Sequence, residues 1–175
     1  MKNGVLSSTV ALALLAVAAI VLVATPAAAE NSIGAGMSLT QTNILGVFAE
    51  LDAAPGLAVQ ANLGIDRARQ FEITGFGVKG IYEVIPAISV VGGLARWQNS
   101  HVVLIGARYT DRVAGLTVYA GVLHQYVLES KKANAGVEAG FKLVVSPRVF
   151  LGAEGGYRVM EDGTPGVSAY VGYTF

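Results

Sequence analysis

The candidates for acid–base or nucleophilic chemistry in this chain are its two histidines and the serines and glutamate near them in the sequence. Ser100 precedes His101, and Glu129 and Ser130 follow His124 along the chain. A nucleophile, a base and an orienting acid must lie within hydrogen-bond reach of one another. The residue alternation described below points His124 and Glu129 to opposite faces of one strand. We therefore expect no catalytic site and no enzyme activity.

Metal and cofactor sites are not predicted either. The chain shows no cluster of His, Asp and Glu with the spacing of metal ligands. Glycine triplets such as Gly34-Ala35-Gly36 fall inside predicted strands and not in the loop before a helix, so they do not indicate a nucleotide site. The formal net charge is zero, so the chain lacks the excess of positive charge that is typical of nucleic-acid-binding proteins. We expect no cofactor, no metal and no nucleic-acid partner.

Charged residues inside the predicted strands share the face opposite the apolar one, and many glycines lie between them. They are Glu50, Asp52, Lys79, Glu83, Arg96, Arg108, Glu138, Lys142, Glu154 and Arg158. Because both signs occur, we expect a network of ion pairs on this face. Neutralised polar filling is one interpretation; a narrow pathway for ions or small solutes is the other, since glycines leave room.

The elements that must position these charges are β-strands. Apolar residues alternate with small or polar ones, which is the two-residue period of a sheet with unlike faces. The predicted strands cover residues 32–40, 44–53, 57–66, 72–83, 88–97, 102–111, 116–129, 135–143, 148–160 and 167–175. Each is near the length that a tilted strand needs to cross a bilayer. This favours an all-β, antiparallel, up-and-down transmembrane barrel of ten strands.

The predicted turns alternate between two sets, as an up-and-down barrel requires. One set is compact and rich in turn formers, at 54–56, 85–86, 112–115 and 146–147. The other covers 41–43, 67–71, 98–101, 130–133 and 161–166. An even strand count puts both termini on one side, which in bacterial barrels is the periplasm, so the second set would be extracellular. Short loops offer little surface on which to build a binding site.

The amino-terminal segment reads as a secretory signal peptide over residues 1–29. Lys2 precedes a long apolar run from Val10 to Ala24, and a small-residue cleavage pattern ends at Ala29. A retained transmembrane helix is the alternative. The barrel domain would then be residues 30–175, without disulfides.

A soluble β-sandwich or lipocalin-like barrel is the main alternative fold. Such a protein buries its apolar face and exposes the polar one. The chain has a mean hydropathy of +0.55 and ends on an aromatic residue, which favours the membrane barrel, with its apolar face outward.

The carboxyl-terminal residues Val171, Tyr173 and Phe175 resemble the signal read by the outer-membrane assembly machinery. With the alternation of the whole mature chain, they make the protein similar to the small bacterial outer-membrane β-barrels, the superfamily of the OmpA membrane domain, OmpX-like proteins and opacity-type porin-like proteins. The resemblance implies a location in the bacterial outer membrane and assembly by that machinery with periplasmic chaperones. Most such relatives have eight strands, so eight remains the alternative to ten.

The expected function is structural: a barrel that contributes to envelope integrity or surface interaction. We expect it to be a monomer that contacts outer-membrane lipid and lipopolysaccharide. A narrow pore is the alternative, and a lipid-modifying enzyme is the third. Trp97 is expected in the aromatic belt at the outer membrane interface, with a carbohydrate-binding platform as the alternative.

Overall fold

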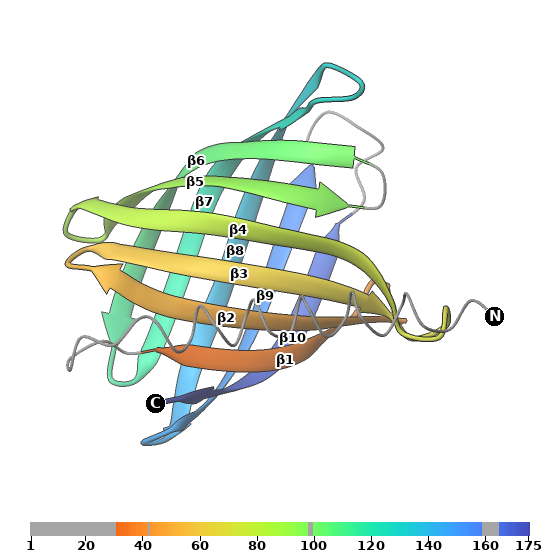
Figure 1. The fold of residues 1–175 in the computed structure, drawn as a ribbon. Helices are drawn as coiled ribbons and strands as arrows, with labels where there is room; N and C mark the ends of the chain where they lie inside the picture. The colour runs from red at the N-terminus through yellow and green to blue at the C-terminus, as the bar shows by residue number, and fades with distance from the viewer. Residues whose placement is uncertain (1–30, 42, 98–99, 159–164) are drawn as a thin grey trace.

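The computed structural model describes residues 31–41, 43–97, 100–158 and 165–175 and shows a closed barrel of ten antiparallel strands (Figure 1). Their bounds are β1 Ser32–Ser38, β2 Ile44–Ala54, β3 Leu57–Asp66, β4 Glu72–Ile85, β5 Ile88–Trp97, β6 Ser100–Val113, β7 Leu116–Val127, β8 Lys132–Ser146, β9 Val149–Arg158 and β10 Gly166–Thr174. The predicted fold and its count of ten strands are confirmed. The predicted signal peptide and the predicted loop residues 98–99 and 161–164 lie outside the described residues. In the described ranges, no helix has the length and apolarity of a membrane span.

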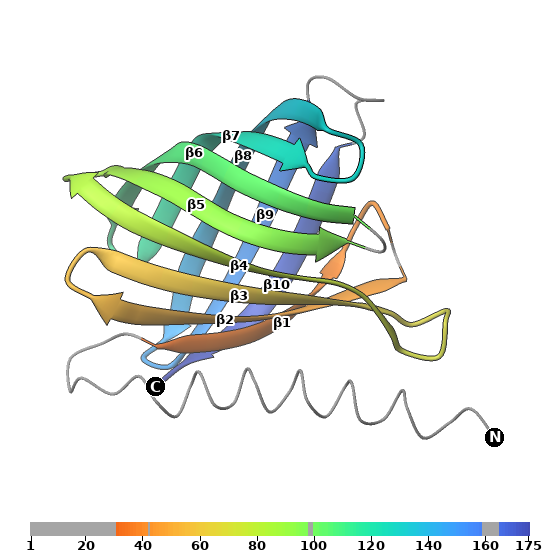
Figure 2. The same ribbon diagram turned by 45° about the horizontal axis from the view of Figure 1, so that its top comes forward.

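Each strand pairs with its neighbours in sequence, and β1 pairs with β10 to close the ring. The closing register runs from Ser32 opposite Thr174 to Ser38 opposite Ser168. Strands β1 to β5 form one wall, and β7 to β10 cross behind it at a steep angle (Figures 1 and 2). The start of β1 and the end of β10 therefore lie together, at the end of the barrel that also holds the tight turns. We call this end the turn end and the opposite one the loop end.

Tight turns at the turn end follow from local backbone chemistry. Ala114 and Gly115 join β6 to β7 with positive φ angles of 47° and 84°. A two-residue turn of this kind matches the right-handed twist of a hairpin, and glycine adopts it without strain. The compact turns predicted from proline and glycine at this end are all present as hairpin turns.

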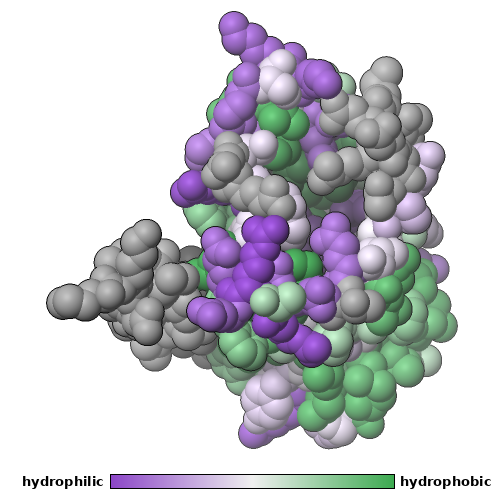
Figure 3. All heavy atoms as spheres, turned by 90° about the vertical axis from the view of Figure 1, so that its right-hand side faces the viewer, coloured by the Kyte–Doolittle hydropathy of each residue, from purple (hydrophilic) through white to green (hydrophobic). Residues whose placement is uncertain are grey.

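From β4 to β10 the outer face of the barrel is apolar and largely exposed. Leu94 is 65% exposed and Ile105 is 63% exposed, although both are large aliphatic side chains. Figure 3, seen from the loop end, shows hydrophobic side chains covering a broad flank while hydrophilic ones gather near the loops. The inner face carries buried charged groups, including Arg108 at 8% exposure. This arrangement is the inverse of a water-soluble sheet protein.

Three aromatic rings inside the barrel hold the closing strands together. The rings of Phe48, Phe150 and Tyr170 have centroids 5.2 to 6.3 Å apart. A side chain at Gly34 on β1 would collide with Phe48, and one at Gly172 on β10 would collide with Phe150. The two glycines therefore leave room for rings supplied by the adjacent strands β2 and β9. Phe150 is 1% exposed.

Candidate functional site

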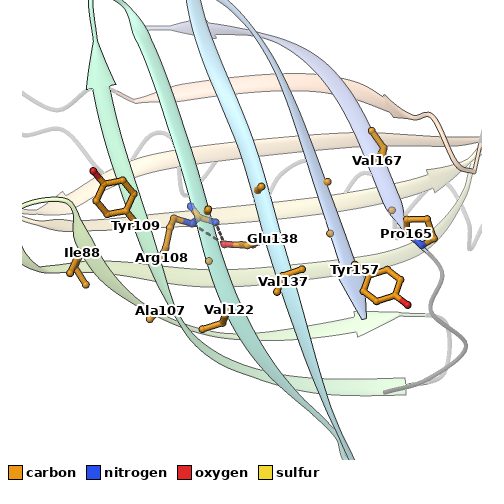
Figure 4. A pocket seen from close by; sticks show the side chains of 16 residues that line it. Ile88, Ala107, Arg108, Tyr109, Val122, Val137, Glu138, Tyr157, Pro165 and Val167 are labelled. Carbon is orange, nitrogen blue, oxygen red and sulfur yellow. Dashed lines mark hydrogen bonds and ion pairs between the residues drawn. The ribbon is translucent and has the colours of Figure 1, made fainter. Parts of the chain in front are cut away.

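Inward side chains of β6 and β8 form an ion pair inside the lumen. Nε and Nη2 of Arg108 both donate to Oε1 of Glu138, at 2.8 and 2.6 Å (Figure 4). Gly121 of β7 lies between the two residues in the ladder and has no side chain to separate them. The two side chains are 9% and 14% exposed, so the pair is largely withdrawn from water. Such charge-assisted hydrogen bonds are stronger than neutral ones.

A third charge reaches this pair from the other wall. Nζ of Lys79, on β4, lies 4.0 Å from Oε2 of Glu138. In the ring of ten strands, β5, β6 and β7 separate β4 from β8, so this contact spans nearly the full width of the lumen. The three charged groups therefore form a layer that crosses the barrel.

Other inward side chains extend this layer toward β2 and β9. The hydroxyl of Tyr119 donates to Oε2 of Glu154 at 2.9 Å, and the guanidinium of Arg108 lies 4.3 Å from the centre of the Tyr119 ring. On the other side, the amide of Gln60 donates to Glu50 at 3.5 Å. Hydrogen bonds to the carboxylates and a ring contact to the guanidinium thus stabilise the charged groups of the layer.

The remaining residues of the predicted network are distributed differently. Lys142 faces the lumen but stacks on the Phe150 ring, with Nζ 4.2 Å from its centre. Asp52 and Glu83 lie on the inner face close to the tight turns. Arg158 belongs to β9, but its side chain lies outside the described residues. The structure thus brings together three of the predicted charges in direct contact: Lys79, Arg108 and Glu138.

The predicted inward position of Arg96 is wrong. Arg96 pairs with the outward Phe76 on one side and with His101 on the other, while Ser89 and Val91 of the same strand are buried inward. Both faces of β5 carry apolar residues, so alternation alone could not orient this strand. Arg96 comes one residue before the strand ends, and a basic side chain near a membrane interface costs only about 0 to 1 kcal/mol.

In the same register Trp97 faces the lumen. Its predicted position in an outward aromatic belt is therefore wrong. Trp97 lies opposite Gly75 of β4, and a side chain at Gly75 or at Gly64 of β3 would meet the indole ring. The ring remains 40% exposed because it lies near the loop end. This inward tryptophan was not predicted from the sequence.

A second polar pair lies at the loop end, on the outside of the barrel. The Glu129 carboxylate accepts hydrogen bonds from the backbone N–H of His101, at 2.8 and 3.0 Å, and contacts Nδ1 of the same residue at 2.5 Å. These hydrogen bonds from His101 lower the pKa of Glu129 below its ordinary value. The pair forms because Leu128 continues the β6–β7 ladder by donating its N–H to the His101 carbonyl. His124 lies further along β7, opposite Ile105.

An apolar groove of about 800 Å³ runs over the outer face of β5 to β10. Small outward residues line it, namely Ala107, Ala120, Ala139 and Gly155. Tyr109 and Tyr157 line it as well (Figure 4). Within the described residues, no group of three His, Asp or Glu side chains is arranged to hold a metal ion.

No family model and no curated protein matches the chain. Among solved structures, a de novo designed transmembrane β-barrel matches with a TM-score of 0.46 and 16% identity, over 87% of this chain and 98% of the other. The N-terminal β-barrel domain of Pseudomonas aeruginosa OprF matches with a TM-score of 0.36 and 19% identity, over 84% and 96%. A loop-deletion mutant of OmpT, an outer-membrane protein of Vibrio cholerae, matches at 0.34 and 21%, over 83% and 59%. At these values the similarity is one of general barrel shape.

Proposed function

We propose that this protein is an integral outer-membrane β-barrel with a structural role in the envelope or in surface interaction. The observation that carries the proposal is the combination of an exposed apolar outer face with an ion pair buried in the lumen. In water this arrangement would expose hydrocarbon and bury charge, both of which are unfavourable. In a bilayer the same arrangement is the favourable one.

Backbone hydrogen bonding supports the membrane location. A membrane interior offers no water to exposed N–H and C=O groups, so a spanning sheet must close on itself. This sheet closes through the β1–β10 pair. Its strands of 7 to 15 residues bracket the 9 to 11 residues that a tilted strand needs to cross the hydrocarbon layer.

The contents of the lumen support a structural role over an open channel. The contact between Lys79 and Glu138 crosses the lumen, and the rings of Phe48, Phe150 and Tyr170 occupy further space inside it. A barrel of about eight strands is filled by its own side chains, and a wide aqueous channel needs about sixteen. Ten strands belong near the filled end of this range.

A narrow ion pore is the second candidate, and the long contact at Lys79 favours it. Arg108 holds Glu138 at 2.6 Å, whereas Lys79 approaches it only to 4.0 Å. Movement of this one side chain would remove the contact across the lumen while leaving the tighter pair intact.

Location and conductance test the two parts of the proposal. We expect the chain to fractionate with outer membranes and to migrate in detergent gels as a folded form that heating converts to a slower one. Recovery as a soluble protein after lysis would contradict the membrane location. In planar bilayers we expect no steady openings; openings that disappear when Lys79 or Arg108 is neutralised would favour the pore.

A further inference from the structure

A small recess opens in the inner wall between Trp97 and Lys79. Three neighbouring rows of the ladder define it: Trp97 lies opposite Gly75, Ala95 opposite Gly77, and Gly93 opposite Lys79. The middle row has only a methyl group and a hydrogen as side chains. A space therefore remains between the indole at the loop end and the ammonium group deeper in the lumen.

Side chains from the flanking strands complete the walls. Asn62 of β3 is the ladder partner of Gly77, and Leu104 of β6 is the partner of Gly93. Both line the recess together with Trp97 and Lys79. Its volume is about 160 Å³. At roughly 30 Å³ for each water molecule, it holds on the order of five waters or one small solute.

The lining of the recess is mostly apolar, and its few polar groups include hydrogen-bond donors. The Lys79 ammonium has donors and no acceptor, the Trp97 indole has one N–H donor, and the Asn62 amide supplies further donors. The Lys79 side chain is only 13% exposed, so its charge interacts strongly with a nearby anion.

The carboxylates of the lumen have partners besides Lys79. Arg108 holds Glu138, the Tyr119 hydroxyl donates to Glu154, and the Gln60 amide donates to Glu50. None of the three carboxylates lines the recess.

We propose that this recess binds a small monovalent anion, held between the Lys79 ammonium and the Asn62 amide against the edge of Trp97. Entry is from the loop end, where the indole is partly exposed. Lys79 also belongs to the charged layer with Arg108 and Glu138, so the site adjoins that layer.

Trp97 gives the site its own reporter, since it is the single tryptophan of the chain. With the full chain folded in detergent micelles, we expect iodide to quench the indole fluorescence in a saturable manner, and acetate to compete with it. Caesium, a cationic quencher of similar charge magnitude, should give weak and linear quenching. Because this measurement needs only the folded barrel, its failure is distinguishable from failure of the membrane proposal.

Two variants assign the saturable quenching to the recess. Lys79→Gln removes the cation and should weaken iodide binding at least about tenfold, the loss expected for one charge-assisted hydrogen bond. Ala95→Leu keeps Lys79 but fills the recess, so it should also abolish the saturable quenching. It provides the test if Lys79→Gln does not fold. Lys142→Gln, which removes an inward cation stacked on Phe150, serves as the matched control and should leave the binding unchanged. Linear iodide quenching in the parent chain, equal affinity in the variants, or saturation by caesium would each overturn the proposal.

Discussion

At the scale of single residues, each strand separates adjacent side chains into two environments. On β8, Val137 is outward and Glu138 holds Arg108 inside the lumen. Neighbours in sequence are thus separated by the thickness of the sheet, and substitutions at the two positions should have unlike effects.

We expect Val137→Arg to lower the free energy of unfolding in lipid vesicles by about 2 to 4 kcal/mol if it lies near the bilayer midplane, because it places a charge in hydrocarbon. Glu138→Gln keeps the side-chain shape and should preserve insertion with a smaller loss. Reversible denaturant unfolding measures both. A harmless Val137→Arg together with a Glu138→Gln that blocks insertion would mean that the faces of β8 are reversed.

The Glu129 carboxyl at the loop end should titrate below an ordinary glutamate, because its charged form accepts hydrogen bonds from His101. A group with a lowered pKa in the folded state contributes stability above its unfolded pKa and loses it as the pH falls through the folded value. Carboxyl NMR titration of the folded protein checks the direction. In His101→Ala the side-chain hydrogen bond is lost, and the pKa should move back upward; an unchanged titration would show that the pair does not persist.

At the scale of elements, the closing strands depend on their neighbours. On the inner face, β1 offers only serine and glycine at Ser32, Gly34, Gly36 and Ser38, so rings from β2, β9 and β10 fill the space over it. The seam, by which we mean the β1–β10 pair, is therefore stabilised by ladder hydrogen bonds and by aromatic rings from the neighbouring strands.

Phe150→Ala should lower the free energy of unfolding by about 3 to 5 kcal/mol, because it empties a fully buried site. Phe141→Ala is the matched control, because Phe141 is an exposed outward ring on β8. Its replacement should lower the free energy of unfolding in detergent by less. Denaturant unfolding of both variants in the same micelles makes the comparison. Equal losses would indicate that the ring cluster does not stabilise the seam.

The carboxyl-terminal residues should matter more for assembly than for the finished barrel. Tyr173 already accepts a hydrogen bond from Arg148 at 3.0 Å, and Phe175 follows the end of β10 with its ring about half exposed. Deleting Phe175 therefore removes little packing, and we expect slower insertion in cells with nearly unchanged unfolding in vitro. Pulse-chase measurement of heat-modifiable protein tests this; insertion at the normal rate would remove the proposed role of Val171, Tyr173 and Phe175 as an assembly signal.

At the scale of the whole molecule, the sequence predicted the architecture better than the interior. The two-residue alternation and the turn formers determine ten strands because both act locally. Contacts such as Lys79 with Glu138 depend on how the barrel closes, which no local pattern encodes. Arg96 and Trp97 could not be oriented because β5 is apolar on both faces, and the His101 and Glu129 pair depends on the register between β6 and β7.

The connectivity of the ring has a consequence for how such a barrel can change size. Every ladder joins strands that are adjacent in sequence, except the one between β1 and β10. A hairpin inserted or removed between β2 and β9 would leave β1, β10 and their partners as they are. The circumference of this barrel can therefore grow or shrink in units of two strands, with both chain ends kept on the same side of the wall.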